Sequence, residues 1–168
     1  EHLQRLDLAR PDQLHQPLPI PRRALELVHS RLYHEGFSRD RLSGPEQRRI
    51  GLPATQPLVR RSWLAVGGTV LTARLALQHG LACHLAGGTH HAFPDYGSGF
   101  CIFNDVAIAA RVLLAEGLVR QLLVVDLDVH QGDGTAAIFQ DDPTVFTLSL
   151  HGAKNFPHRK EPGDLDVD

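Results

Sequence analysis

The chain has 168 residues, with 17 lysine and arginine residues against 19 aspartate and glutamate residues, and its formal net charge at pH 7 is −2. This length suits one domain with a substantial hydrophobic core, and the near-balanced charge offers no basic face, so we expect no direct nucleic-acid binding. Two cysteines without a C-x-x-C motif argue against a disulfide scaffold and a thiolate zinc site.

No apolar run reaches about 18 residues, and no signal-peptide pattern opens the chain. We therefore expect a protein with no membrane contact, located in the cytoplasm or, in a eukaryote, in the nucleus. Residues 1–62, which are rich in proline and arginine, predict a helical and loop region. Within it, residues 21–33 predict one helix, because Pro21 suits a first helical turn and apolar residues follow at helical spacing.

Residues 63–168 predict an α/β core that carries the candidate site. Runs rich in small and apolar residues that end in glycine predict helices, and shorter apolar runs predict strands. The helices are expected over residues 64–80, 104–117 and 134–142, and the strands over residues 81–88, 121–129 and 144–152. This alternation with near-continuous apolar strands is typical of a parallel sheet covered on both faces. We expect residues 1–168 to form a single domain.

Three side chains with metal-binding chemistry follow one another at the end of the strand at 121–129. Side chains alternate across a strand, so Asp126, Asp128 and His130 are expected on one face. Burying two unpaired carboxylates is costly unless a cation or hydrogen-bond donors compensate them. The pattern therefore predicts a bound cation. The alternative is that the two acids cap the next helix and accept hydrogen bonds from loop amides.

The donor types narrow the choice of metal. Carboxylate oxygen and imidazole nitrogen suit zinc or iron(II), and a catalytic zinc site typically combines three protein ligands with an open position. Asp128 and His130 supply two of them. The polar C-terminal stretch offers no convincing third ligand among its acids, which are Glu161, Asp164, Asp166 and Asp168.

A tandem histidine pair, His90 and His91, follows a diglycine at the end of another predicted strand. Imidazoles titrate near neutral pH and can move protons to and from a metal-activated water. An acid that binds the far ring nitrogen fixes the tautomer, and Asp126 and Asp133 are the natural partners. Two histidine and aspartate pairs beside a metal would form a proton-transfer apparatus.

Three segments together carry a family resemblance: "GGTHHAFPDYGSGFCIFND", "VVDLDVHQGDGTAAIF" and "TLSLHGAKNFP". In their order and spacing they resemble the signature segments of the zinc-dependent histone deacetylase superfamily, and Gln131 marks similarity to its class IV branch and bacterial relatives. The resemblance implies an α/β fold of the arginase/deacetylase type, a three-layer sandwich with a central parallel sheet that is incomplete in this chain. It also implies hydrolytic removal of an acyl group from a lysine side chain, a polyamine or another small amine.

Matched position by position, the resemblance assigns roles to the candidate residues. The implied zinc ligands are Asp128 and His130, and the implied proton-handling residues are His90 and His91, backed by Asp126 and Asp133. The implied substrate contacts are the backbone of Gly99 and the aromatic channel walls Phe100 and Phe156, for which plain core packing is the alternative. The implied shell of a structural potassium ion is Asp126, Asp128, His130, Ser149 and Leu150.

The chain also departs from the family pattern. Members continue past this point with a third zinc ligand, an aspartate, and usually a tyrosine that stabilises the oxyanion, and the sequence contains no methionine. We therefore expect a truncated piece of a longer enzyme rather than a non-catalytic remnant, and expect this segment alone to be inactive. Two rival functions stay open: a manganese ureohydrolase of the same fold, and a module that binds acyl-lysine or a polyamine without turnover.

Overall fold

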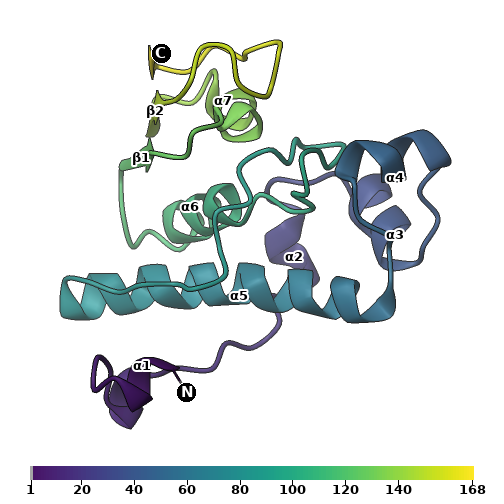
Figure 1. The fold of residues 1–168 in the computed structure, drawn as a ribbon. Helices are drawn as coiled ribbons and strands as arrows, with labels where there is room; N and C mark the ends of the chain where they lie inside the picture. The colour runs from purple at the N-terminus through teal and green to yellow at the C-terminus, as the bar shows by residue number, and fades with distance from the viewer. Residues whose placement is uncertain (1) are drawn as a thin grey trace.

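The computed structural model describes residues 2–168 as a set of helices and a small parallel sheet arranged around one long helix (Figure 1). The longest helix packs along the next one, and strands and helices alternate after it. In chain order the elements are α1 (His2–Arg5), the 3₁₀ helix η1 (Pro11–Gln13), α2 (Arg22–Leu25), α3 (Arg31–Ser38), α4 (Gly44–Ile50), α5 (Gln56–His79), α6 (Asp105–Ala115), β1 (Leu122–Asp126), α7 (Asp133–Phe139), β2 (Val145–Leu150) and β3 (Leu165–Val167).

The sheet has the order β1-β2-β3, and both neighbouring pairs are parallel, which confirms the predicted parallel sheet. Helices α6 and α7 cover one face, where Phe139 and Val145 are buried together and Val124 packs against them. The register places Asp126 opposite Ser149. Because parallel strands end at the same edge, the loops that follow β1 and β2 emerge side by side, and these loops carry the candidate site.

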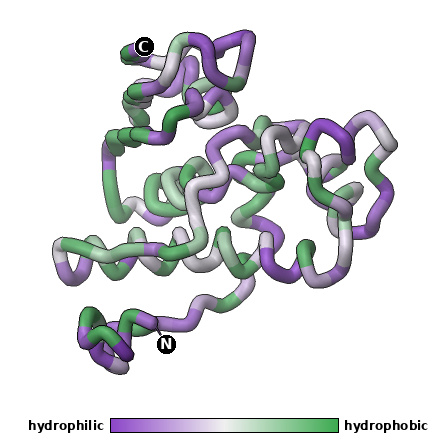
Figure 2. The backbone as a smooth tube through the Cα atoms, viewed as in Figure 1, coloured by the Kyte–Doolittle hydropathy of each residue, from purple (hydrophilic) through white to green (hydrophobic). Residues whose placement is uncertain are grey.

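The other face of the sheet is apolar and exposed among residues 2–168. Leu123 and Phe146, which pair across β1 and β2, are 60% and 47% exposed, and Val125 is 50% exposed. Figure 2 shows that both α6 and β1 are largely hydrophobic, with a hydrophilic interruption in the segment that connects them. Within residues 2–168, no helix combines the length and the hydropathy needed to cross a bilayer.

The main core lies between α5, α6 and the helices that precede them, and Phe103 stands at its centre. This side chain is 2% exposed, and its ring lies edge-on to Phe37, Tyr33 and Trp63 at centroid distances of 5.6, 6.1 and 6.3 Å. Phe103 immediately precedes Asn104, the N-cap of α6. The core therefore fixes the start of α6, which lies directly beneath the tandem histidines.

Two sequence-based expectations about the N-terminal region are wrong. The single helix predicted over residues 21–33 is two helices, because Ser30 adopts an extended backbone (ψ 145°) and accepts a hydrogen bond from Tyr33 N as the N-cap of α3. The predicted loop after it contains α4, which begins at a capping box formed by Ser43 and Glu46.

Helix α5 begins earlier than the predicted residue 64. Thr55 is its N-cap and accepts a hydrogen bond from Leu58 N, and a proline follows within the first turn. Residues 62 and 63, where the sequence suggested a change from loop region to core, therefore lie within one continuous helix. The helix ends as predicted, with Gly80 in the left-handed conformation at φ 85°.

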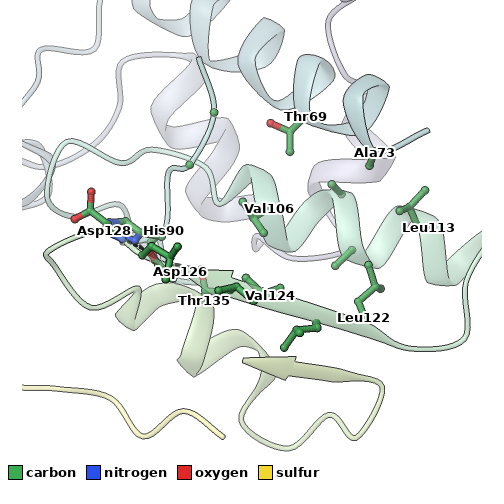
Figure 3. A pocket seen from close by; sticks show the side chains of 17 residues that line it. Thr69, Ala73, His90, Val106, Leu113, Leu122, Val124, Asp126, Asp128 and Thr135 are labelled. Atoms are coloured by element: carbon green, nitrogen blue, oxygen red, sulfur yellow. Dashed lines mark hydrogen bonds and ion pairs between the residues drawn. The ribbon is translucent and has the colours of Figure 1, made fainter. Parts of the chain in front are cut away.

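The strand predicted over residues 81–88 is also wrong. This segment makes no ladder in the structure, since the amides of Gly88 and Thr89 donate to the carboxylate of Asp105 instead. A groove of about 510 Å³ separates it from the exposed edge of β1. Figure 3 shows side chains of α5 and α6 on one wall of this groove, β1 on the other, and His90, Asp126 and Asp128 gathered at one end.

His29 ties two distant parts of the chain together and is 1% exposed. Its Nδ1 lies 3.0 Å from the carbonyl oxygen of Phe93, and its Nε2 accepts a hydrogen bond of 2.9 Å from Asn104 N. Both contacts use the neutral ring with its proton on Nδ1. Burial lowers the pKa of His29 to about 4 against an ordinary value of 6.5.

This lowered pKa predicts a loss of stability in acid. Below pH 6.5 the unfolded chain binds a proton at His29, whereas the folded chain keeps this ring neutral until the pH approaches 4. The contribution of His29 to the free energy of unfolding is therefore largest above pH 6.5 and falls as the pH drops towards 4. The expected loss is about 3 kcal/mol. Denaturant unfolding of the parent and of His29→Gln between pH 7 and pH 4 measures it. Equal slopes for the two proteins would contradict the prediction.

The exposed sheet face predicts self-association of the 168-residue chain. An unpaired strand edge beside an apolar face favours edge-to-edge pairing. We expect concentration-dependent oligomers in size-exclusion chromatography with light scattering, and Leu123→Lys, at the edge strand, should reduce them. Leu32→Lys, at a leucine outside the sheet that is even more exposed (88%), is the control and should not. A monodisperse monomer at high concentration would show that this face needs no cover.

Candidate active site

The structure brings the two histidines together with the acids that the sequence assigned to them. His90 Nδ1 lies 2.5 Å from Asp126 Oδ2, and His91 Nδ1 lies 2.6 Å from Asp133 Oδ1. The two rings lie 4.0 Å apart between centroids. Asp126 ends β1 and Asp133 begins α7, so the strand and the helix that follows it each supply one carboxylate.

These contacts fix the chemistry of both rings. Each carboxylate accepts a hydrogen bond from Nδ1–H of its histidine, which leaves Nε2 as the nitrogen able to exchange a proton. Burial alone would lower the pKa of His90, but the hydrogen bond and charge of Asp126, with the charges of Asp128 and Asp133, outweigh it and raise the pKa above its ordinary value. The pair of His91 and Asp133 is more deeply buried, with side-chain exposures of 5% and 7%.

Asp128 and His130 lie beside the histidine pairs but in a more open position. Asp128 Oδ1 lies 2.9 Å from His130 Nδ1, and the side chains are 51% and 43% exposed. Slight burial would raise the pKa of Asp128, but hydrogen bonds from the His130 backbone and ring and the charge of His90 lower it below its ordinary value. A carboxylate oxygen and an imidazole nitrogen that converge in this way suit zinc.

The turn that carries these two residues differs from the prediction. Strand β1 ends at Asp126, and the chain then bends, with Asp128 N donating to Asp126 Oδ1 at 3.0 Å and His130 N donating to Asp128 Oδ1 at 2.8 Å. The alternative reading of these acids, as acceptors for loop amides, is therefore also seen. Leu127, between Asp126 and Asp128 in this turn, is 71% exposed.

The structure describes no third ligand beside Asp128 and His130. Within residues 2–168, no three or more His, Cys, Asp or Glu side chains are placed so that together they could hold a metal ion. Asp164 accepts hydrogen bonds from Thr147, and Asp166 accepts them from Gln131 and Gly163, so these acids hold β3 and its preceding loop against β2. Asp164 and Asp166 therefore serve the packing of β3 in this structure.

Two of the three residues assigned to substrate contact, Gly99 and Phe156, lie against His91. A Cβ atom on Gly99 would lie 2.8 Å from His91 Cδ2 and 3.0 Å from Phe156, so only glycine fits there. The Phe156 ring lies edge-on to His91, with centroids 4.9 Å apart, and 6.2 Å from the ring of His130. Phe100 is 69% exposed, which rules out plain core packing for its ring.

Helix α4, which the sequence did not reveal, holds the loop of Gly99 and Phe100. Both residues have a positive φ, 52° and 65°. Their amides donate to the carbonyl oxygens of Arg49 and Ile50 at the end of α4, at 3.2 and 2.8 Å. Phe100 is strained in this conformation, and the hydrogen bonds to α4 maintain it.

Gln131 is a second residue whose structural role the sequence did not reveal. It is 1% exposed, and its amide nitrogen donates to the carbonyl of Glu161 at 2.6 Å and to Asp166 at 2.8 Å, while its oxygen accepts from Glu161 N at 2.9 Å. From the sequence, Gln131 indicated only a similarity to the class IV branch of the family. Its side chain joins the site loop to the segment before β3, a contact across 30 residues that no local pattern indicates.

Comparisons with known proteins agree with this site. The family model of the histone deacetylase domain matches residues 1–167. An uncharacterized protein of Picosynechococcus sp. is 59% identical over 158 residues, which cover 94% of this chain and 53% of that protein. Acetoin utilization protein AcuC of Staphylococcus aureus is 36% identical over 166 residues, which cover 93% of this chain and 42% of that protein.

Solved structures agree as well. The crystal structure of an HDAC homolog from Aquifex aeolicus has a TM-score of 0.84 at 26% identity and covers 99% of this chain and 50% of that one. An HDAC homolog complexed with SAHA has the same TM-score at 27% identity. The expected arginase/deacetylase-like fold is thereby confirmed. The chain spans about half the length of the relatives that it matches.

Proposed function

Since this chain belongs to the histone deacetylase family, we propose that the protein is a zinc-dependent hydrolase that removes an acetyl or related acyl group from a lysine side chain or a small amine such as a polyamine. The observation that carries the proposal is the pair of histidine–aspartate contacts at 2.5 and 2.6 Å beside the converging side chains of Asp128 and His130. A cytoplasmic location is part of the same proposal.

In this proposal Asp128 and His130 would hold zinc, which supplies Lewis-acid polarisation of the acyl carbonyl and acidifies water. His91, oriented by Asp133, takes the proton of the attacking water on Nε2 and returns it to the leaving amine. His90, oriented by Asp126, assists this transfer. Because both Nδ1 atoms are engaged by carboxylates, the charge that each ring gains is offset inside a poorly solvated site.

The substrate stem would lie between Phe156 and Phe100 and reach the histidines past Gly99. Support comes from the Phe156 ring against His91 and from the steric requirement for glycine at position 99. An alkyl chain flanked by aromatic rings gains from apolar contact, while a bulkier chain would not pass. The family assignment favours acyl hydrolysis over the manganese ureohydrolase alternative, and binding without turnover is an outcome of the tests below.

A structural potassium ion remains part of the proposal. The expected shell is Asp126, Asp128, His130, Ser149 and Leu150. Supporting it, β1 and β2 place Asp126 directly opposite Ser149, and Ser149 is 8% exposed with its hydroxyl 2.9 Å from His151 Nδ1. An oxygen-rich position at the ends of two strands suits a hard cation.

The zinc assignment predicts a loss of metal on removal of either ligand. In the protein expressed from its complete reading frame, Asp128→Ala and His130→Ala should each lower bound zinc and abolish acetate release from acetyl-lysine, because each removes one of few ligands. Leu127→Ala, at an exposed neighbour, is the control and should keep both. Metal analysis and acetate assays measure the outcome. An unchanged zinc content in both variants would contradict the assignment of Asp128 and His130 as zinc ligands.

The histidine assignment predicts a different pattern. His91→Ala should retain zinc yet lose about 10²–10⁴-fold in turnover, since a general acid–base group serves the proton and not the metal. His79→Ala, at the exposed end of α5, controls for loss of an imidazole elsewhere. If His91→Ala hydrolysed acetyl-lysine at the parental rate, its proton-transfer role would be wrong. Zinc-replete protein that binds acetyl-lysine but never releases acetate would instead support a binding module.

A further inference from the structure

We propose that Asn104 and Asp105, the adjacent residues at the start of α6, are positioning residues that hold the main chain of Gly88 to Ala92 and thereby aim the tandem histidines. The inference rests on the proposed function, because it concerns the placement of His90 and His91 for proton transfer. Neither residue touches the reacting groups, so their effect passes through the backbone that carries the histidines.

Asp105 holds the segment on the N-terminal side of the histidines. Its side chain is fully buried, at 0% exposure. Its carboxylate accepts hydrogen bonds from Thr89 N at 2.7 Å and from Gly88 N at 3.1 and 3.2 Å. The hydroxyls of Thr89, at 2.5 Å, and of Thr69 also point at it. The carboxylate is therefore surrounded by donors, and two of them are the consecutive amides just before His90.

Asn104 holds the segment on the other side. It is also 0% exposed. Its amide nitrogen lies 3.5 Å from the carbonyl oxygen of His90, 3.3 Å from that of Ala92 and 3.0 Å from the Thr135 hydroxyl. Thr135 N in turn donates to the carbonyl of His90 at 3.1 Å. The main chain is thus held by amide donors after it passes the first histidine and by a carboxylate acceptor before it.

Helix capping alone does not explain this arrangement. The capping function of Asn104 uses its side-chain oxygen, which accepts from Ala107 N at 3.0 Å, and leaves its amide nitrogen to the histidine segment. Asp105 is in the first turn of α6, where an exposed acid would already interact favourably with the helix dipole. Complete burial of a carboxylate is costly unless donors compensate it, and the donors here come from the histidine segment and from α5.

The link to α5 passes through Thr69. Its hydroxyl donates to Asp105 and lies 2.9 Å from His84 Nδ1, so it accepts from the ring when Nδ1 carries the proton. A Cβ atom on Gly87 would lie 2.7 Å from Asp105 Oδ2, 2.8 Å from His84 and 2.9 Å from Thr69, so the glycine lets these groups meet. Thr69, Asn104 and Asp105, which we call the clamp, therefore join α5 and α6 to the histidine segment, Gly88 to Ala92.

The first test is Asp105→Asn in the protein from its complete reading frame. The substitution keeps the shape but turns one acceptor into a donor that faces other donors. We expect kcat for acetyl-lysine hydrolysis to fall about 10- to 100-fold, as for loss of a group that orients a ligand or catalyst, with KM and bound zinc unchanged. Val112→Ala, at a buried position on the same helix away from the clamp, should destabilise α6 and leave kcat unchanged.

A milder pair of variants covers the case in which Asp105→Asn does not fold. Thr69→Val replaces the hydroxyl by a methyl group of similar size and should lower kcat, whereas Thr69→Ser keeps the donor and should restore it. If Val112→Ala lost as much kcat as Asp105→Asn, the effect would be one of general helix stability, and the proposed positioning role would be wrong. An unchanged kcat in folded Asp105→Asn, or an equal kcat in Thr69→Val and Thr69→Ser, would overturn the proposal.

An NMR measurement on the protein from its complete reading frame tests the inference without activity. Thr89 N–H should exchange slowly in the parent and rapidly in Thr69→Val or Asp105→Asn, and the side-chain ¹⁵N signals of His90 and His91 should change with it. If the parent protein hydrolyses no acyl-lysine, the proposed function fails, and these signals still report whether the clamp places the histidines. Identical histidine signals in parent and folded variants would reject the clamp.

Discussion

The site depends on hydrogen bonds between carboxylates and one five-residue stretch, Gly88 to Ala92. The carboxylates bind both the main chain of this stretch and its two imidazoles. Asp126 and Asp133 bind the Nδ1 atoms of His90 and His91, and Asp105 binds the backbone amides just before them. The three acids come from the end of a strand and from the starts of two helices. Each would be costly to bury alone, and each is compensated by donors of the same segment.

This arrangement explains why the fold around the site is fixed although residues 81–88 form no strand. The start of α6 is held by Phe103 in the main core and by His29, which bonds both Asn104 N and the carbonyl of Phe93. The tandem histidines directly precede the Phe93 anchor, and the strained Gly99–Phe100 turn lies between the two anchors. Rigid packing beneath the loop thus replaces a regular strand as the support for the site.

The sequence predicts those parts of the structure that follow from local patterns. Strands β1 and β2 and helix α6 appear as apolar runs with clear ends, and the D-x-D-x-H spacing with the tandem histidines points to the site for which we propose a function. The strand expected at 81–88 fails because a strand also needs a partner, and its last amides meet Asp105 instead. The single helix at 21–33 fails because the Ser30 cap, which an apolar periodicity does not reveal, starts a new helix.

Residues that act across long sequence separations were missed for a different reason. Gln131 bonds a segment 30 residues away, and α4 supports the Gly99–Phe100 turn through backbone atoms alone. A glutamine in a loop and a short arginine-containing helix carry no local sign of such contacts, because the partner is defined only once the chain has folded. Asp105 resembles an ordinary first-turn acid until its complete burial is known.

The two halves of the site differ in a way that follows from charge. A carboxylate bonded to an imidazole N–H can be buried without a cation, and the pairs of His90 with Asp126 and His91 with Asp133 have side-chain exposures between 5% and 16%. Asp128 and His130 stay half-exposed, at 51% and 43%, with only each other and loop amides as partners. The half that we propose to handle protons is therefore organised by the fold itself, while water still reaches Asp128 and His130, the two side chains proposed to hold the metal, and solvates their charge.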